Sequence, residues 1–272
     1  MNTRMLVDLE VPVIGMGSAN TFNVEAEEGL DVRRQIIDSC ITSGSTFIDT
    51  SPMYGRAEKA LGVSMEGKAD QFQFATKVWA VGKETGRRQI ARSFELLKTD
   101  HVHVFQIHNM VDWRTHLPYL EGLREKGKID LIGISYTFPP GFPEMMEIMK
   151  TRRIHTIQVS YNILEREAEE EMLPLAEELG MGVIVMRPLA SGALAKDMAH
   201  QPDLTPLAEF GITTWPQALL AWVLADPRVS ILIPSSTRPE RILQNAVAGA
   251  LPTLPNELRE YISKEAQRCL NS

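Results

Sequence analysis

The sequence feature that most constrains the fold is an alternation of short apolar runs with longer amphipathic stretches. The runs are rich in Val, Ile and Phe, as parallel strands buried on both faces usually are. Eight such runs occur, at residues 12–18, 46–51, 72–78, 102–108, 130–135, 156–161, 182–187 and 229–234. Eight strands that alternate with helices predict an α/β chain folded as a (β/α)8 barrel. The length of 272 residues agrees with this, since such barrels usually have about 250 residues.

The stretches between the runs carry apolar residues at helical spacing. We expect helices near residues 32–41, 89–97, 117–123, 142–149, 168–179, 217–224 and 239–247. Pro239 suits a first helical turn, where its missing N–H costs nothing. A short N-terminal segment and a C-terminal helix at about 255–269 flank the barrel. No linker divides the chain, so we expect residues 1–272 to form one barrel domain rather than two smaller domains.

A doubly wound nucleotide-binding sheet is the main alternative for strands that alternate with helices. That fold needs a third glycine in the turn after its first strand. Here Gly15 and Gly17 are present, but Asn20 stands where the third glycine should be. We therefore reject this fold, and a dinucleotide would have to bind without that turn.

Composition excludes several classes of function. The net charge is −7 and no basic patch is evident, which argues against a nucleic-acid partner. No apolar run reaches the length of about 18 residues that a membrane span needs, and the first residues do not look like a signal peptide. The two cysteines, Cys40 and Cys269, have no metal-binding spacing. These observations predict a cytoplasmic protein with reduced thiols.

Four polar residues stand at the carboxyl ends of consecutive predicted strands, where barrel enzymes build their active sites. They are Asp49, Tyr54, Lys77 and His108. Hydride addition to a carbonyl leaves an alkoxide that needs a proton, and a free phenol, with a pKa of about 10, is a weak acid. A lysine ammonium would lower the pKa of Tyr54, an aspartate would keep that lysine charged, and a neutral histidine would orient the carbonyl. Each residue alone could be structural, but the four together indicate carbonyl reduction.

These segments resemble the aldo-keto reductase family over nearly the whole chain. The resemblance lies in residues 47–62, 76–79, 106–108, 221–229 and 233–245. It implies a monomeric, NADPH-dependent enzyme that reduces an aldehyde or ketone. It also implies that Tyr54 is the general acid, that Lys77 and Asp49 tune it, and that His108 helps to place the carbonyl.

The same resemblance assigns a set of residues to the cofactor, with NADH as a possible substitute for NADPH. They are Gly17, Ser18, Ser135, Gln158, Met186, Arg187, Leu189, Ser191, Ser236, Thr237, Arg238, Arg241, Gln244 and Asn245. Arg238 and Arg241 favour NADPH, because a planar guanidinium suits a 2′-phosphate. Alternatively, they belong to a solvated helix face.

Four positions depart from the family pattern. Met186 stands where an aromatic residue often stacks on the nicotinamide, and Tyr136 where an asparagine often follows Ser135. Ser235 replaces a lysine and Arg187 replaces a small polar residue. Arg187 could reach a cofactor phosphate, bind an acidic substrate, or pair with a carboxylate.

The chain after residue 245 is short for the family, which implies an open substrate pocket. We expect Trp79, Trp113 and Tyr136 to line it. We expect no metal, because His101 and His103 lie at the start of a strand, on the face of a barrel that serves stability. Two other functions remain open: a Schiff-base aldolase built on Lys77, and a non-catalytic NADP(H)-binding sensor or partner subunit.

Overall fold

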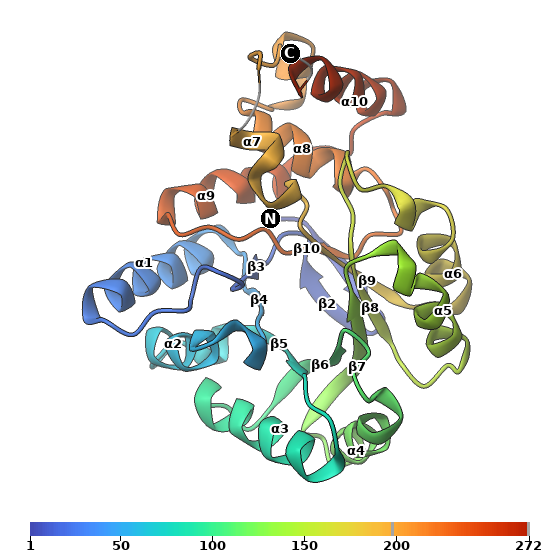
Figure 1. The fold of residues 1–272 in the computed structure, drawn as a ribbon. Coiled ribbons are helices and arrows are strands. Elements are labelled where there is room, and N and C mark those ends of the chain that lie inside the picture. Colours follow the sequence, from blue (N-terminus) through green and yellow to red (C-terminus); the bar gives the residue numbers. More distant parts are fainter. Residues whose placement is uncertain (197–198, 271–272) are drawn as a thin grey trace.

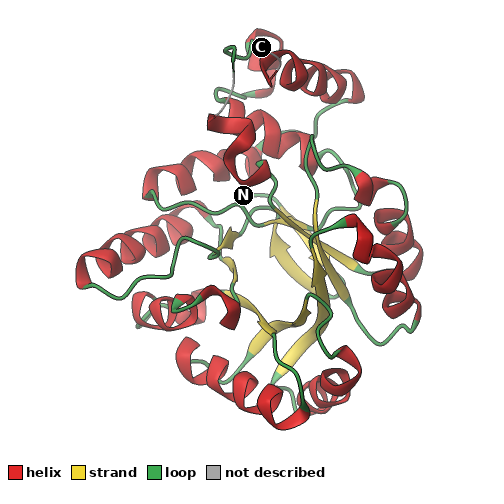
Figure 2. Ribbon diagram, in the orientation of Figure 1, coloured by secondary structure: helices red, strands yellow, loops and turns green. Residues whose placement is uncertain are grey.

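The computed structural model describes residues 1–196 and 199–270 and forms a ring of parallel strands inside a ring of helices (Figure 1, Figure 2). One eight-stranded sheet has the order β10-β9-β8-β7-β6-β5-β4-β3, and every neighbouring pair is parallel. The strands are β3 (Met16–Gly17), β4 (Phe47–Asp49), β5 (Gln73–Val78), β6 (Val102–His108), β7 (Ile129–Tyr136), β8 (Thr156–Ser160), β9 (Gly182–Met186) and β10 (Ile231–Leu232). All eight predicted runs are confirmed as strands.

The barrel closes between its first and last strands through a few hydrogen bonds. Leu232 N donates to Val13 O at 2.9 Å, and Gly15 N donates to Leu232 O at 2.8 Å. Gly17 N donates to Pro234 O at 3.1 Å. A Cβ on Gly17 would lie 2.9 Å from Ile233 O. The two glycines considered for a nucleotide-binding turn therefore serve the close approach of strands at this seam.

The helices cover the outside of the barrel, one after each strand. They are α1 (Glu27–Ser43), α2 (Ala57–Ser64), α3 (Lys83–Leu97), α4 (Trp113–Glu125), α5 (Phe142–Lys150), α6 (Met172–Leu179), α8 (Trp215–Leu224) and α9 (Pro239–Val247). The short α7 (Ala193–Lys196) precedes α8, and α10 (Asn256–Leu270) follows α9. Contacts between α1 and α9 close the helical ring. None of the helices in the described ranges is long and apolar enough to cross a bilayer.

The predicted helix at 168–179 is wrong as a single unit. A 3-10 turn, η4 (Glu167–Glu169), ends before α6 begins at Met172. Pro174 explains the break, because a proline ring clashes with the carbonyl four residues before it in a continuous helix. Helix α2 was not predicted. It carries Gly62, whose Cβ would lie 2.0 Å from Leu96 O, so packing against α3 requires a residue that weakens the helical pattern.

The N-terminal segment forms a hairpin that closes the bottom of the barrel. Strands β1 (Thr3–Leu6) and β2 (Leu9–Pro12) pair antiparallel, and β2 is visible across the barrel opening in Figure 1. Leu6 and Val11 pack with the innermost barrel side chains, which include Phe47 and Val104. The side chain of Leu6 occupies the space beside Gly182, the first residue of β9. The hairpin therefore seals the amino-terminal end and leaves the carboxyl-terminal end as the open mouth.

The alternation of side chains along the strands sets up the mouth. Phe47 and Ala75 belong to the apolar layer above the hairpin. Two residues further along the same strands, Asp49 and Lys77 face the same interior, because side chains in a strand repeat with period two. The register of the strands therefore places an apolar layer next to the hairpin and, above it, a polar layer that contains Asp49 and Lys77.

Candidate active site

Asp49 and Lys77 form a buried ion pair in the polar layer of the barrel. Lys77 Nζ lies 2.7 Å from both Asp49 carboxylate oxygens and donates to Thr50 O at 2.8 Å. The two side chains are 1% and 3% exposed. Burial lowers the pKa of Lys77, but the charges of Asp49 and Tyr54 and the hydrogen bonds to Asp49 outweigh it, so the net pKa is raised. Lys77 is therefore held as an ammonium ion.

Tyr54 sits over this pair at the barrel mouth. It ends a 3-10 turn, η1 (Pro52–Tyr54), that directly follows β4. Lys77 Nζ lies 5.4 Å from the centroid of the Tyr54 ring, and the His108 ring meets that ring edge to face at 5.8 Å. The structure thus brings together all four residues singled out from the sequence.

The net pKa shift of Tyr54 differs from the sequence expectation. Burial raises the pKa of the phenol, and Lys77 opposes this effect without reversing it. Since a buried phenolate loses its hydration, the neutral form is favoured. Tyr54 is consequently a protonated phenol at neutral pH, the form that can donate a proton.

His108 is buried and neutral. Burial, with a smaller contribution from the charge of Lys77, lowers the pKa of its imidazole to about 3. Its Nδ1 lies 2.8 Å from Ser51 Oγ. A neutral imidazole has one N–H donor and one acceptor, so His108 can donate to a carbonyl oxygen without carrying charge.

Three neighbours of the four residues were not singled out from the sequence. Gln106 Nε2 donates to Asp49 Oδ1 at 3.2 Å, Thr50 accepts from Lys77 through its backbone oxygen, and Ser51 contacts His108. Gln106 lies two residues before His108 on β6, so strand alternation could have indicated its inward direction. Ser51 and Thr50 lie in a loop, and no periodicity predicts their partners.

Ser135 and Gln158 could hold an amide group at the mouth. They face each other in register on β7 and β8, and both are buried. Ser135 Oγ and Gln158 Oε1 have no hydrogen-bond partner within residues 1–196 and 199–270. Buried polar atoms are normally paired, so these two fit the carboxamide of a nicotinamide. Gly17 and Ser18 lie at the end of β3, where Ser18 N donates to Asp49 O at 2.9 Å.

The loop after β9 contains the next group of expected cofactor residues. Met186 ends β9 half-buried, Leu189 is half-buried and Ser191 is exposed. Arg187 pairs with Glu165 at 2.8 Å, and its Nε donates to Ser191 Oγ at 3.1 Å. Of the three roles considered for Arg187, this contact favours pairing with a carboxylate.

The remaining expected cofactor residues surround the start of α9. Ser236, Thr237 and Arg238 precede Pro239, the first residue of the helix, as the sequence predicts. Arg241 Nη1 donates to Gln244 Oε1 at 3.0 Å, and Asn245 is buried. Arg238 and Arg241 are exposed and form no ion pair with the described residues. Exposed guanidinium groups at a helix N-terminus suit an anion such as a phosphate.

The three residues expected to line a substrate pocket follow neighbouring strands. Trp79 comes after β5 and is 42% exposed, Trp113 begins α4, and Tyr136 ends β7. The backbone N–H and the backbone carbonyl of Trp79 are both hydrogen-bonded to the side-chain amide of Gln89. All three residues therefore belong to the carboxyl-terminal side of the barrel, the side on which Tyr54 lies.

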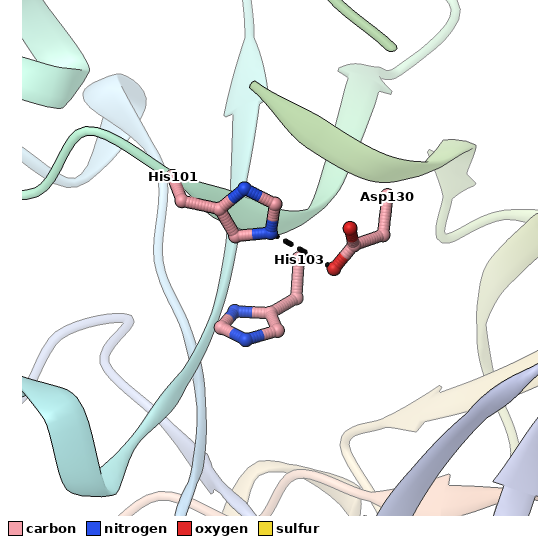
Figure 3. A group of neighbouring side chains, drawn as sticks. All are labelled: His101, His103 and Asp130. Carbon is pink, nitrogen blue, oxygen red and sulfur yellow. Dashed lines mark hydrogen bonds and ion pairs between the residues drawn. The ribbon is translucent and has the colours of Figure 1, made fainter. Parts of the chain in front are cut away.

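His101 and His103 form a cluster with Asp130 at the opposite end of the barrel (Figure 3). His101 Nε2 lies 2.9 Å from Asp130 Oδ2, and its Nδ1 lies 3.1 Å from Gly127 O. His103 Nδ1 accepts the Phe74 N–H at 3.1 Å. In neutral His103 the proton is then on Nε2, so this ring offers no free lone pair to a cation. The absence of a metal stays a prediction.

A cavity of about 900 Å³ lies beside this cluster and not at the mouth. Its lining includes Phe72, Phe74, Phe94, Tyr119 and Lys128. Its lining contains none of the four residues Asp49, Tyr54, Lys77 and His108. We therefore place the candidate active site at the mouth, where the titratable groups converge.

Comparison with known proteins gives a consistent result. The model of the aldo/keto reductase family matches residues 13–265. The methylglyoxal reductase YeaE of Escherichia coli is 26% identical over 246 residues, which cover 88% of this chain and 86% of that protein. An uncharacterized oxidoreductase, YrpG, of Bacillus subtilis is 30% identical over 215 residues, which cover 68% of this chain and 65% of YrpG.

Solved structures extend the likeness to the fold. An aldo/keto reductase from Klebsiella pneumoniae, crystallised with NADP and acetate, superposes with a TM-score of 0.81 at 26% identity and covers 97% of this chain and 93% of that one. The holo form of an aldo-keto reductase from Bacillus halodurans gives a TM-score of 0.80 at 25% identity and covers 100% of this chain and 98% of that one. These structures agree with the (β/α)8 barrel described above.

Proposed function

Because the chain belongs to the aldo/keto reductase family, we propose that it is an NADPH-dependent oxidoreductase that reduces an aldehyde or ketone to an alcohol, with Tyr54 as proton donor. The observation that carries this proposal is the buried Lys77–Asp49 pair beneath Tyr54, next to a neutral His108. A proton donor, a cation that favours its conjugate base and a neutral hydrogen-bond donor are the groups that carbonyl reduction requires.

Reduced nicotinamide, when bound, supplies the hydride that none of the side chains can provide. The phenol of Tyr54 donates its proton to the carbonyl oxygen as that oxygen gains negative charge. Lys77 lies 5.4 Å from the ring centroid and stabilises the phenolate that remains. Asp49 keeps Lys77 charged, and Thr50 O fixes its position. Besides the oxidised nicotinamide, the products would be the alcohol and a tyrosinate, which solvent reprotonates.

The cofactor preference rests on residues of this chain and on the relatives. Ser135 and Gln158 offer unpaired buried polar atoms for the carboxamide. Arg238 and Arg241 offer guanidinium groups at the α9 N-terminus for the 2′-phosphate, which is the reason to prefer NADPH over NADH. The Klebsiella pneumoniae relatives were crystallised with NADP and with NADPH. We also propose that Met186 contacts the nicotinamide and that Leu189 and Ser191 cover the pyrophosphate.

The aldolase alternative is disfavoured by the electrostatics of Lys77. Schiff-base chemistry needs a lysine with a lowered pKa, so that the amine is free to attack. Here the pKa of Lys77 is raised, because Asp49 and Tyr54 outweigh burial. An ammonium ion held by two carboxylate oxygens and a backbone oxygen is not a nucleophile.

We further propose that residues 1–272 act as one monomeric unit in the cytoplasm, with Trp79, Trp113 and Tyr136 around the substrate. Cys40 and Cys269 are free and buried, which supports a reducing compartment. Light scattering of the purified protein tests the monomer. A dimer at micromolar concentration would contradict it.

The experiment for the proposed activity combines binding and turnover. The protein is titrated with NADPH and NADH, followed by fluorescence, and then mixed with a panel of aldehydes and ketones that includes methylglyoxal. We expect tighter binding of NADPH and its oxidation by at least one carbonyl. Tight binding without oxidation on the whole panel would support the sensor alternative, and no binding of either nucleotide would refute the cofactor assignment.

A further inference from the structure

Ser51, in the loop after β4, contacts His108, the last residue of β6, beneath the barrel mouth. Ser51 is completely buried and His108 is 7% exposed. Ser51 Oγ lies 2.8 Å from His108 Nδ1. The same oxygen accepts the backbone N–H of Met53 at 3.1 Å, because Ser51 is the N-cap of η1. Nδ1 is thereby engaged, and Nε2 is the ring nitrogen left for a substrate.

In the hydrogen bond between Ser51 Oγ and His108 Nδ1, either atom could be the donor. The other hydrogen bonds of Ser51 distinguish these two arrangements. If His108 Nδ1–H donated, Ser51 Oγ would accept two hydrogen bonds, from His108 and from Met53. The hydroxyl hydrogen of Ser51 would then have no acceptor within residues 1–196 and 199–270. A buried donor without a partner loses its hydration without compensation.

The opposite arrangement gives a partner to both the Ser51 hydroxyl and His108 Nδ1. Ser51 accepts from Met53 N and donates its own hydrogen to His108 Nδ1. His108 is neutral, because burial and Lys77 lower its pKa to about 3, so its ring carries one proton. With Nδ1 as an acceptor, that proton is on Nε2.

Two other histidines show the same arrangement with backbone donors. His103 Nδ1 accepts from Phe74 N and His155 Nδ1 accepts from Ile132 N, both at 3.1 Å. A backbone N–H can only donate, so these two contacts leave no choice of tautomer. They serve as internal references for His108, whose partner is a hydroxyl that could act in either direction.

We infer that Ser51 is a positioning residue that holds His108 as the Nε2–H tautomer and so directs an N–H donor toward the carbonyl oxygen. This inference rests on the proposed reductase function. Tyr54 O–H and His108 Nε2–H then offer two donors to one oxygen. The other tautomer would direct a lone pair at the developing alkoxide and destabilise the transition state.

Nitrogen NMR of the ¹⁵N-histidine-labelled protein near pH 7, without cofactor or substrate, tests the tautomer directly. A His108→Gln variant identifies the His108 resonances by their loss. We expect an unprotonated Nδ1 and a protonated Nε2 for His108, with the same pattern for His103 and His155. A protonated Nδ1 on His108 overturns the inference whether or not the protein reduces carbonyls, so this outcome is separate from a failure of the proposed function.

Substitution of Ser51 tests the consequence for turnover. Ser51→Ala should lower kcat by roughly 100-fold, the lower end of the range of about 10²–10³ for loss of one oxyanion donor. KM and NADPH affinity should change little. Ser51→Thr keeps a hydroxyl that can cap η1 and donate to Nδ1, and should restore most of kcat and the Nε2–H pattern. A Ser51→Ala protein with wild-type kcat and an unchanged tautomer would overturn the inference.

Discussion

Replacement of Lys77 by methionine should destabilise the protein far more than loss of an ordinary ion pair does. Lys77 Nζ makes three close contacts, two to Asp49 and one to Thr50 O. Methionine fills a similar volume but leaves the Asp49 carboxylate buried, and the one side-chain donor that remains to it among the described residues is Gln106 Nε2, at 3.2 Å. The perturbation therefore creates an uncompensated buried charge.

The size of the effect follows from this burial. Breaking a buried ion pair by removing one partner costs about 3–5 kcal/mol, against a total stability of about 5–15 kcal/mol for a typical domain. Asp49→Asn combined with Lys77→Met removes both charges, so the double variant should recover about half of the loss or more. The non-additivity of the two substitutions measures the coupling.

Arg92→Met is the matched control. Arg92 and Glu95 also approach to 2.7 Å, but their side chains are 63% and 64% exposed. Solvent screens such a pair, which contributes at most about 1 kcal/mol. Urea denaturation at pH 7, followed by far-UV circular dichroism, gives the free energy of unfolding for each variant. If Lys77→Met costs no more than Arg92→Met, the argument from burial is refuted.

Three further predictions concern other parts of the molecule. Arg241→Ala should weaken NADPH binding by about 10- to 100-fold, since hydrogen bonds to charged groups contribute about 1.5–3 kcal/mol. The affinity for NADH should not change. An equal loss of affinity for both nucleotides in fluorescence titrations would contradict the 2′-phosphate role. The pKa of His108 is about 3 in the folded protein against about 6.5 when unfolded, so the stability that neutral His108 contributes is present above about pH 6.5 and is lost as the pH falls toward 3. The free energy of unfolding of His108→Gln should therefore depend less on pH in this range than that of the wild-type protein. Parallel pH profiles for the two proteins would contradict this prediction. Calorimetric titration with Zn²⁺ should show no tight site, and one that disappears in His103→Ala would disprove the tautomer assigned to that ring.

Local sequence pattern was sufficient to predict the eight strands and the convergence of Asp49, Tyr54, Lys77 and His108. Buried parallel strands carry a continuous apolar signal, and the carboxyl ends of such strands converge in a barrel. Asp49, Lys77 and His108, which stand at the carboxyl ends of three predicted strands, are therefore expected to lie close together, as they do in the structure. The helix start at Pro239 was equally local, because proline suits a first turn.

Features that depend on distant segments could not be predicted. Helix α2 contains Gly62, whose place is explained by contact with α3 and not by its own helical propensity. The pairing of Arg187 with Glu165 joins the loops after β9 and β8, and no spacing in the sequence indicates it. The direction of the pKa shift of Tyr54 required its burial, since the sequence shows the opposing lysine but not the loss of water.

The central claim is that Tyr54 donates the proton in carbonyl reduction, and the most direct test compares wild-type protein with Tyr54→Phe. NADPH affinity and the rate of NADPH oxidation are measured for both, with the best carbonyl from the panel. Since a positioned general acid contributes about 10²–10⁴-fold, we predict wild-type NADPH affinity and a loss of turnover of at least about 100-fold in Tyr54→Phe. Turnover of the variant at the wild-type rate would contradict the account.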